Sequence, residues 1–252
     1  MKTATKTLAT LFVTSFAVSP LVMADEEKVI EKTFDVQQGA SFDIDNVNGA
    51  INIYKSDNDQ IKVIATVSAK SESQLERIKI DMVQNGNKVD VETKYKQSSW
   101  GNNNSGDVNY DVWLPDNMSE TDVDLVNGSL KIEGVSGELD ADLVNGSIDV
   151  SELDGDAKLN SVNGSVTARY TSLTAVKDIE IETVNGSIKV FLPSNPDIRV
   201  DAETMHGSIK SDFSFDIEKS MFSGRSMTGT VGNGTTSMSL ESVNGGIKVF
   251  EN

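Results

Sequence analysis

The sequence predicts an all-β protein whose strands stack as a solenoid. A short phrase of Asn-Gly, one small residue and one aliphatic residue recurs along most of the chain, with His replacing Asn once. Its seven copies begin at Asn48, Asn127, Asn145, Asn163, Asn185, His206 and Asn244. The four central copies are separated by 18, 18 and 22 residues. A repeat of about 20 residues is typical of stacked β units.

Apolar residues alternate with polar ones on both sides of each copy. Val123 and Leu125 precede Asn127, while Leu130 and Ile132 follow it with the opposite parity. Alternation with a period of two predicts half-buried strands, and the change of parity predicts a tight turn or corner between them. We expect Gly to supply a positive φ at this point and Asn to tolerate it. The predicted structural turn residues are Asn48, Gly49, Asn127, Gly128, Asn145, Gly146, Asn163, Gly164, Asn185, Gly186, His206, Gly207, Asn244 and Gly245.

Two architectures fit this pattern. In an antiparallel β-meander each Asn-Gly closes a hairpin, which would place Asp124 opposite Lys131 and Glu182 opposite Lys189. In a solenoid each Asn-Gly forms a corner, and equivalent residues of successive rungs stack about 4.8 Å apart. The even spacing and the Ser after nearly every Gly favour the solenoid, because stacking rewards repetition of the same side chain. The meander remains the alternative.

Residues 1–24 have the features of a secretory signal. Lys2 and Lys6 precede an apolar stretch, and Val22-Met23-Ala24 offers a cleavage site. The apolar stretch is short for a membrane span. We expect an exported mature chain that begins at Asp25, has no transmembrane segment, and resides in the periplasm or at the cell surface, or is secreted. Loss of the two lysines takes its formal charge from -17 to -19.

Within the mature chain we expect an N-terminal β region over residues 25–118, followed without a break by the repeat solenoid over residues 119–252. A short helix is predicted for residues 72–79, with Ser71 as N-cap and Gln74 completing a capping box. The polar stretch 96–106 predicts a loop that contains Trp100. Its side chain either folds back on its own strand or is exposed, and an exposed aromatic side chain can bind sugar rings. Residues 211–234 interrupt the repeats, and we expect one irregular rung there.

The amino-acid composition excludes one class of partner and two covalent modifications. The chain is strongly acidic and has only four Arg residues, so we expect no nucleic acid partner. It contains no Cys, which excludes disulfides and a lipid-bearing Cys. Stability has to come from the stacked apolar core.

The sequence offers little catalytic chemistry. The single His, His206, occupies the Asn position of one repeat, and we interpret it as a turn residue. With one His and no Cys, we find no Ser-His-Asp set, zinc-ligand spacing or thiol nucleophile. No Gly-rich phosphate loop followed by Lys and Ser or Thr occurs. We therefore expect no catalytic, cofactor-binding or metal-binding residues, and no cofactor.

A column of carboxylates lies three residues before the Asn positions. It consists of Asp45, Asp124, Asp142, Glu182, Glu203 and Glu241, with Asn160 as the exception. One interpretation is a solvated outer face with ordinary low pKa values, which would not serve general acid-base catalysis. The other is a surface for calcium or a cationic partner. The column and Trp100 together form the candidate binding surface.

These phrases resemble a family of bacterial proteins built of β-strand repeats, labelled adhesins and long known as a domain of unknown function. The resemblance rests on Val47-Asn48-Gly49, the strand ending at Leu114-Pro115, the serial Asn-Gly-Ser phrases, and Phe191-Leu192-Pro193 followed by residues 204–209. It covers nearly all of residues 28–250. It implies a right-handed, single-stranded β-helix-like fold in an exported or envelope protein, without established catalytic residues.

Two functions fit these observations. The first is an exported, non-enzymatic, adhesin-like or structural binding protein of the cell envelope, with a glycan or a cationic protein as partner. The second is a carbohydrate-active enzyme, a polysaccharide lyase or hydrolase, on a β-helix. An enzyme needs two or three carboxylates that converge with Arg or Lys, whereas a binding scaffold shows them as a ladder.

Overall fold

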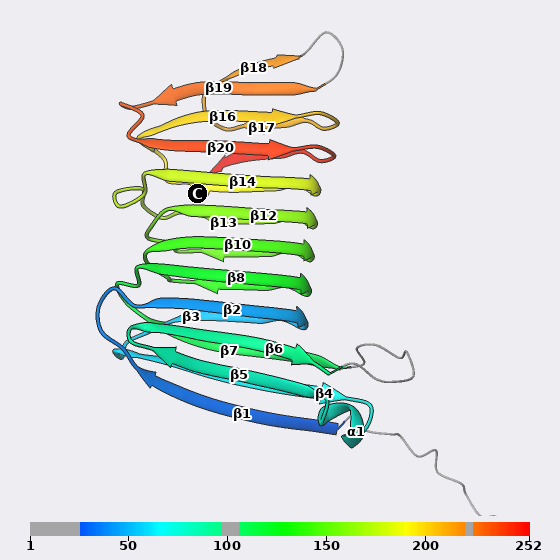
Figure 1. The fold of residues 1–252 in the computed structure, drawn as a ribbon. Helices are drawn as coiled ribbons and strands as arrows, with labels where there is room; N and C mark the ends of the chain where they lie inside the picture. Colours follow the sequence, from blue (N-terminus) through cyan, green and yellow to red (C-terminus); the bar gives the residue numbers. More distant parts are fainter. Residues whose placement is uncertain (1–25, 97–105, 220–223) are drawn as a thin grey trace, which may run out of the picture.

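The computed structural model describes residues 26–96, 106–219 and 224–252. Two large, mostly parallel β-sheets lie face to face and enclose the apolar core (Figure 1). Sheet 1, with 11 strands, has the order β18-β19-β16-β20-β14-β12-β10-β8-β2-β6-β5. Sheet 2, with 10 strands, has the order β1-β4-β7-β3-β9-β11-β13-β15-β21-β17. The predicted all-β solenoid is confirmed.

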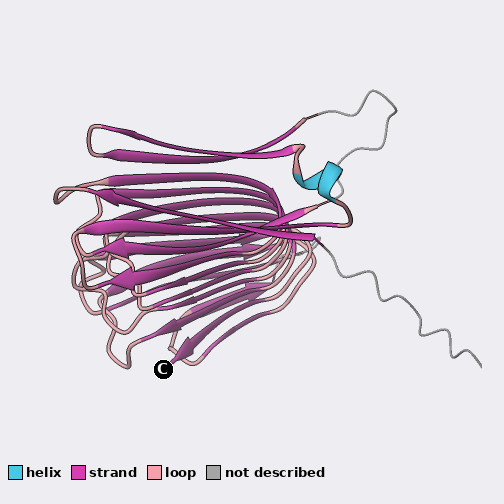
Figure 2. Cartoon of the chain, turned by 90° about the horizontal axis from the view of Figure 1, so that it is seen from below, coloured by secondary structure: helices cyan, strands magenta, loops and turns pink. Residues whose placement is uncertain are grey.

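Each rung has one strand in sheet 1, a corner, and one strand in sheet 2 (Figure 2). The rungs with an Asn-Gly or His-Gly corner are β2 (Ser41–Asn48) with β3 (Ile51–Ser56), β8 (Glu120–Asn127) with β9 (Leu130–Glu133), β10 (Glu138–Asn145) with β11 (Ile148–Ser151), β12 (Ala157–Asn163) with β13 (Val166–Arg169), β14 (Asp178–Asn185) with β15 (Ile188–Leu192), β20 (Thr236–Ser242) with β21 (Ile247–Glu251), and β16 (Ile198–Thr204) with β17 (Ile209–Ser211). A further rung consists of β6 (Lys88–Tyr95) and β7 (Asp107–Pro115), which flank residues outside the described part.

The strand register excludes the meander. β8 and β10 are parallel, so Asp124 lies beside Asp142 and Asn127 beside Asn145. In sheet 2, Lys131 lies beside Asp149. The hairpin pairing of Asp124 with Lys131 therefore does not occur, because each Asn-Gly passes the chain from one sheet to the other.

The order of rungs in space differs from their order in sequence. β20 lies between β14 and β16 in sheet 1, and β21 lies between β15 and β17 in sheet 2. The last rung of the chain therefore fills a place inside the stack, as the colours of Figure 1 show.

Antiparallel strands cover the N-terminal end of the stack. β1 (Glu26–Asp35) pairs with β4 (Gln60–Ala69), which pairs with β7, and β5 (Ile78–Asn85) pairs with β6. The β5-β6 connection is a true hairpin, in which Asn85 faces Lys88 across Gly86. Terminal units of repeat proteins need such a cover, since an uncovered rung exposes its apolar face and its strand edge.

The helix is shorter than predicted. α1 spans only Glu72–Leu75, because residues from Ile78 onward form β5. Ser71 occupies the N-cap position, but its side chain makes no capping hydrogen bond and instead contacts the Ser73 hydroxyl at 3.2 Å. The predicted capping box is therefore wrong, and α1 packs against β4 and β1.

The C-terminal end of the stack is also antiparallel. β18 (Asp216–Lys219) pairs with β19 (Arg225–Val231), and β19 pairs with β16. The irregular rung expected in residues 211–234 is therefore wrong, because the described residues of this segment continue sheet 1 as an antiparallel edge and, among them, no strand beyond β17 joins sheet 2.

Inward-facing aliphatic residues of the two sheets form one continuous core. In the rung of β8 and β9 these are Val123, Leu125, Leu130 and Ile132, all at most 2% exposed. Each such side chain contributes roughly 1.5–3 kcal/mol by burial. Among the described residues no helix is long and apolar enough to cross a membrane.

Candidate binding groove

The Asn residues of the corners form a hydrogen-bonded ladder along the stack. The side-chain amide of each donates to the amide oxygen of the Asn in the preceding rung, at 2.9 Å in every case. The ladder joins Asn48, Asn127, Asn145, Asn163, Asn185 and Asn244 in spatial order. His206 follows as the last corner, where its backbone N–H donates to Val243 O at 2.9 Å. The predicted turn residues thus lie in one line.

Gly is required at these corners for two reasons, of which the sequence predicted one. Gly49, Gly128 and Gly146 have positive φ values of 118°, 159° and 157°, whereas Gly164 and Gly186 do not have positive φ. A Cβ on Gly146 would also collide with the carbonyl oxygen of Gly128, and one on Gly164 with that of Gly146. The predicted positive φ is therefore confirmed at the first three corners and wrong at the later ones, where the close stacking of successive corners excludes a side chain.

A groove runs along the outer face of sheet 1, beside this corner. Its volume is about 1230 Å³, and it crosses every rung from β6 to β19. The predicted carboxylates Asp124, Asp142, Glu182, Glu203 and Glu241 line it, and so do Asp45 and Asn160. The register of the parallel strands places these seven residues in a single column.

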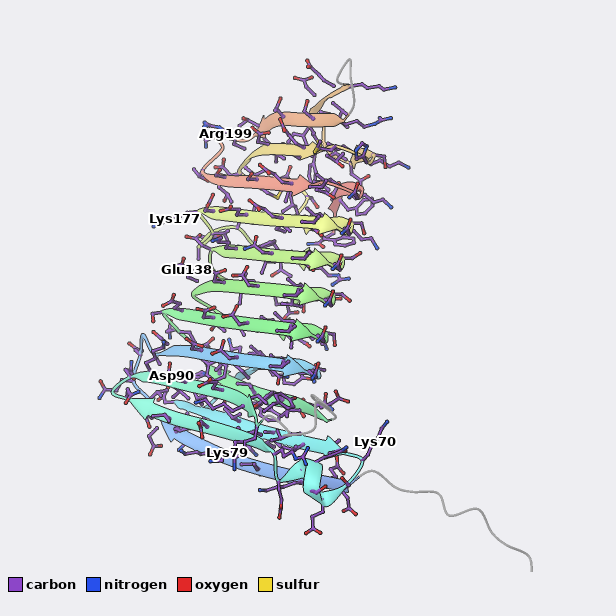
Figure 3. The ribbon with its side chains drawn as sticks, turned by 45° about the vertical axis from the view of Figure 1, so that its right-hand side comes forward. Lys70, Lys79, Asp90, Glu138, Lys177 and Arg199 are labelled. Carbon is purple, nitrogen blue, oxygen red and sulfur yellow. The ribbon has the colours of Figure 1, made fainter. Side chains whose placement is uncertain are left out.

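A second column in the groove is apolar. The residue before each corner Asn or His points outward, and these residues are Val47, Val126, Val144, Val162, Val184, Val243 and Met205. Val126 is 39% exposed and Met205 is 55% exposed. In each of these rungs the polar residue of the first column lies two positions before the apolar residue of the second, on the same outward face of the strand (Figure 3 draws the side chains of the stack). The groove therefore offers a carboxylate and an apolar contact in every one of these rungs except that of β12, where Asn160 replaces the carboxylate.

The carboxylates of the groove are largely without cationic partners. Among the described residues, none of the six acidic members of the column forms an ion pair. Asp142 accepts a hydrogen bond from Asn160 at 2.8 Å, which explains why an amide is tolerated at the one exceptional position. Cationic side chains enter the lining only at the end near β18 and β19, where Lys219 and Arg225 lie.

Crowding of carboxylates changes their titration. Desolvation and the neighbouring Asp43 raise the pKa of Asp45, and desolvation and Asp45 raise that of Asp124. Asp122, one column further from the corner, has its pKa raised to about 6 by desolvation and by the charges of Asp43 and Asp124. The expectation of low pKa values on a hydrated face is therefore wrong for these groups, because parallel pairing brings like charges together.

The other sequence-predicted features are distributed differently. Trp100 lies outside the described residues. Trp113 faces outward on sheet 2, where its ring lies 5.8 Å from that of Tyr54. Within the described residues no group of three or more His, Asp or Glu side chains is arranged to hold a metal ion.

Two columns on the outer face of sheet 1 go beyond the sequence prediction. The exposed Val column repeats in the sequence as an apolar residue on the outward parity, which by itself indicates only stacking. The column of Asp43, Asp122 and Asp140 does not line the groove, and each of its members lies five residues before a corner Asn. Both signals required the strand register to be known first.

Comparison with solved structures gives distant likenesses. One, named "putative cell adhesion protein", comes from Clostridium sporogenes ATCC 15579; it shares 18% identity, covers 89% of this chain and 100% of its own, and has a TM-score of 0.42. Another, named "putative adhesin", comes from Bacteroides fragilis NCTC 9343, with 12% identity, coverage of 88% and 97%, and a TM-score of 0.33. A third, named "Putative lipid binding protein", comes from Parabacteroides distasonis ATCC 8503, with 12% identity, coverage of 88% and 96%, and a TM-score of 0.29. At these values the likenesses carry no information about a ligand.

No curated protein sequence matches the chain. The model of the Toastrack DUF4097 family matches residues 101–250, which is more than half of the sequence. The matched region includes six of the seven corners and most of the groove. The resemblance to a repeat family of unknown function is thereby confirmed, and the chain belongs to the Toastrack DUF4097 family.

Proposed function

We propose that the protein is an exported, non-enzymatic binding protein of the bacterial envelope, and that the groove of sheet 1 receives a cationic partner with apolar groups. The observation that carries this proposal is the pairing of two columns in one groove. Unpaired carboxylates repeat along one side, and exposed Val side chains repeat along the other.

The energetics of the groove support a cationic ligand. Stacked carboxylates repel one another, and this repulsion adds to desolvation, the larger cause, in raising the pKa of Asp45 and of Asp124. A ligand cation relieves that repulsion, and burial of the exposed Val column adds a favourable apolar term. Because both columns repeat in each rung, an extended ligand gains many weak contacts at once.

The arrangement of the carboxylates gives less support to an enzyme. Asp122, whose pKa is raised to about 6 mainly by desolvation, has the titration expected of a general acid. However, it stands in a ladder of like residues on parallel strands, between Asp43 and Asp140. A lyase or hydrolase needs carboxylates that converge with a cationic side chain on one bond of the substrate.

The test is a binding measurement with defined peptides. Calorimetry compares a peptide of alternating Lys and Leu with an alternating Lys and Ser peptide of the same length, at low and at physiological salt. We expect tighter binding of the Lys-Leu peptide and weaker binding as salt increases, because salt screens exposed charges. Equal binding of the two peptides would contradict an apolar contribution.

Matched variants locate the contact. The triple change Asp124→Asn, Asp142→Asn and Glu182→Gln should weaken binding by at least about tenfold, the scale of losing several linked weak contacts. The control triple Asp57→Asn, Asp59→Asn and Glu72→Gln removes as much charge outside the groove and should have little effect. Similar losses in both triples would reject the groove.

The proposal that the protein is not an enzyme is tested separately. The mature protein is incubated with pectin, alginate, peptidoglycan and chitin, and release of products is measured. We expect no turnover. Turnover of any of these that is lost in Asp122→Asn would establish the enzyme alternative instead.

A further inference from the structure

The outer face of sheet 2 carries three lysines in one line. Lys189 lies beside Lys248 in the parallel pairing of β15 and β21, and Lys210 lies beside Lys248 in that of β17 and β21. Neighbouring strands are about 4.8 Å apart, so the three ammonium groups stand over consecutive rungs. Each of these lysines lies four residues after a corner Asn or His, and the insertion of β21 between β15 and β17 places Lys248 in the middle of the line.

Elsewhere along sheet 2, the charged residues of the same column are paired with residues of opposite charge. Lys131 forms an ion pair with Glu133 at 3.2 Å, and Asp149 forms one with Arg169 at 2.6 Å. No ion pair joins Lys189, Lys210 or Lys248 to a carboxylate among the residues that the structure describes. Like charges directly opposite each other on adjacent strands are destabilising. In a chain of net charge -17, three such neighbouring cations indicate a role other than stability.

Aromatic rings lie next to the lysines on the same face. Phe191 and Phe250 are each two residues beyond a lysine of the column, and their ring centroids are 5.3 Å apart. Both are only partly buried, and the Arg169 guanidinium lies over the Phe191 ring at 5.1 Å. Inward-facing Ile188, Ile247 and Ile209 are at most 4% exposed and fix these strands to the core.

We infer that this face, the lysine-phenylalanine surface formed by Lys189, Lys210, Lys248, Phe191 and Phe250, binds an anionic polysaccharide. A polymer that carries one carboxylate on each sugar and lies along the stack presents its acid groups to successive lysines. The apolar face of a sugar ring packs on the phenylalanine rings beside them. An inorganic polyanion satisfies the lysines but makes no use of the rings, and this distinguishes a glycan from a purely electrostatic ligand.

This surface is distinct from the groove. It lies on sheet 2, whereas the carboxylate and Val columns lie on sheet 1, and the two surfaces have opposite charge. The inference does not depend on the proposed function of the groove, so each can fail alone.

The experiment uses the mature chain and alginate oligosaccharides as the anionic glycan, with inorganic polyphosphate as the comparison. Binding is measured by calorimetry at several salt concentrations. We expect the triple variant Lys189→Gln, Lys210→Gln and Lys248→Gln to lose about tenfold or more in affinity for alginate, with a weaker dependence on salt. Lys131→Gln, in the same column but ion-paired, is the matched control and should bind within about twofold of the unmodified protein.

The rings provide the second readout. Phe250→Ala should weaken binding of alginate by about tenfold and leave binding of polyphosphate unchanged, because only the sugar packs on the ring. Thermal melts verify that all variants are folded. If the triple variant binds alginate as tightly as Lys131→Gln, the surface is not the site. If Phe250→Ala leaves alginate binding unchanged, the glycan assignment is wrong and the lysines recognise charge alone.

Discussion

At the scale of single residues, the corner shows how closely this fold is packed. Each corner Gly presents its carbonyl oxygen to the position where the Cβ of the next corner would lie. Ser161, Thr183 and Ser242, on the inward side of the corner, donate their hydroxyls to the carbonyl oxygens of Gly146, Gly164 and Gly186 at 3.1–3.2 Å. The corner therefore tolerates neither a larger residue nor a looser spacing.

Gly146→Ala should lower the free energy of unfolding by about 1–3 kcal/mol, the usual scale for overpacking. The causes are collision of the new methyl group with the Gly128 backbone and the strain of a positive φ, 157°, at a residue other than Gly. Urea denaturation of the mature protein measures the change. Gly86→Asn is the control, because Gly86 has φ 64° with open space around it, and Asn tolerates that conformation. Equal losses in both variants would show that the Gly128 contact is not the cause.

For two buried tyrosines, Tyr110 and Tyr170, we predict that removal of the hydroxyl group has different effects on the free energy of unfolding. Tyr110 shares a hydrogen bond with Thr93 at 2.6 Å, whereas the Tyr170 hydroxyl has no partner among the described residues. Tyr110→Phe should cost about 1 kcal/mol, while Tyr170→Phe should cost nothing or stabilise the protein by up to about 1 kcal/mol. Urea denaturation again measures both. A loss in Tyr170→Phe equal to that of Tyr110→Phe would mean that the hydroxyl is bonded in solution.

At the scale of elements, the Asn ladder is directional. Asn163 donates to Asn145 and accepts from Asn185, whereas Asn48, at the start of the ladder, accepts from Asn127 and has no ladder oxygen to donate to. Loss of the side-chain amide donor should therefore destabilise the fold more at an Asn inside the ladder than at its first Asn.

Asn163→Asp should lower the unfolding free energy by about 1–3 kcal/mol, because it places a carboxylate oxygen against the Asn145 amide oxygen. Asn48→Asp keeps the acceptor for Asn127 and should cost clearly less. Thermal melts of the two variants at neutral pH provide the comparison. A larger loss in Asn48→Asp than in Asn163→Asp would reverse the assigned direction of the ladder.

The repeats were predictable because every rung has to bury the same strand face and turn the same corner. Alternating aliphatic residues such as Val123 and Leu125, and the recurring Asn-Gly, determine strand faces and corners from local sequence alone. The antiparallel ends were not predictable in this way. Residues 216–219 and 225–231 have no recurring phrase. β19 pairs with β16 and β18 pairs with β19, and tertiary contacts alone select these partners. The groove was likewise predictable only in part. The spacing of its carboxylates in the sequence places them in one column, but that they line a groove follows only from the strand pairing.

At the scale of the whole molecule, charge is divided between the two faces. Parallel stacking gathers carboxylates on sheet 1, where Asp122 and Asp140 are neighbours and the pKa of Asp140 is also raised, mainly by desolvation. Lysines gather on sheet 2. Carboxylates that repel one another oppose folding when they are ionised.

Stability should therefore increase as the pH falls from about 7 toward about 5. Asp122 sets this range, because its pKa of about 6 in the folded state lies above the usual 3.8, so the folded state binds a proton there more readily than the unfolded state. The pKa values of Asp45, Asp124 and Asp140 are raised as well and act in the same direction. Asp81 and Asp197, whose pKa values are lowered by Lys94 and by hydrogen bonds from Thr235 and Asn233, act in the opposite direction only at lower pH.

Melting temperatures from pH 7 to pH 5 measure this effect. Asp122→Asn should melt higher than the unmodified protein at pH 7 and should show a smaller change with pH. Asp81→Asn, which removes a paired carboxylate, is the control and should not melt higher at pH 7. A melting temperature that is constant or decreases on acidification over this range would contradict the prediction.

The insertion of β20 and β21 between earlier rungs has a consequence for biosynthesis. While the chain is being made, β16 cannot take its final place in the stack, because β20, which separates it from β14, is made after it. A chain that ends at Gly234 should therefore leave β14 and β15 with open edges and β16–β19 without an anchor, and we expect proteases to cleave it rapidly. Pulse proteolysis of that shortened chain, beside one that lacks only Glu251 and Asn252, tests this, and equal resistance of the two chains would contradict it. Synthesis of β20 and β21 is thus a condition for closing the stack, and a product interrupted before them keeps open strand edges.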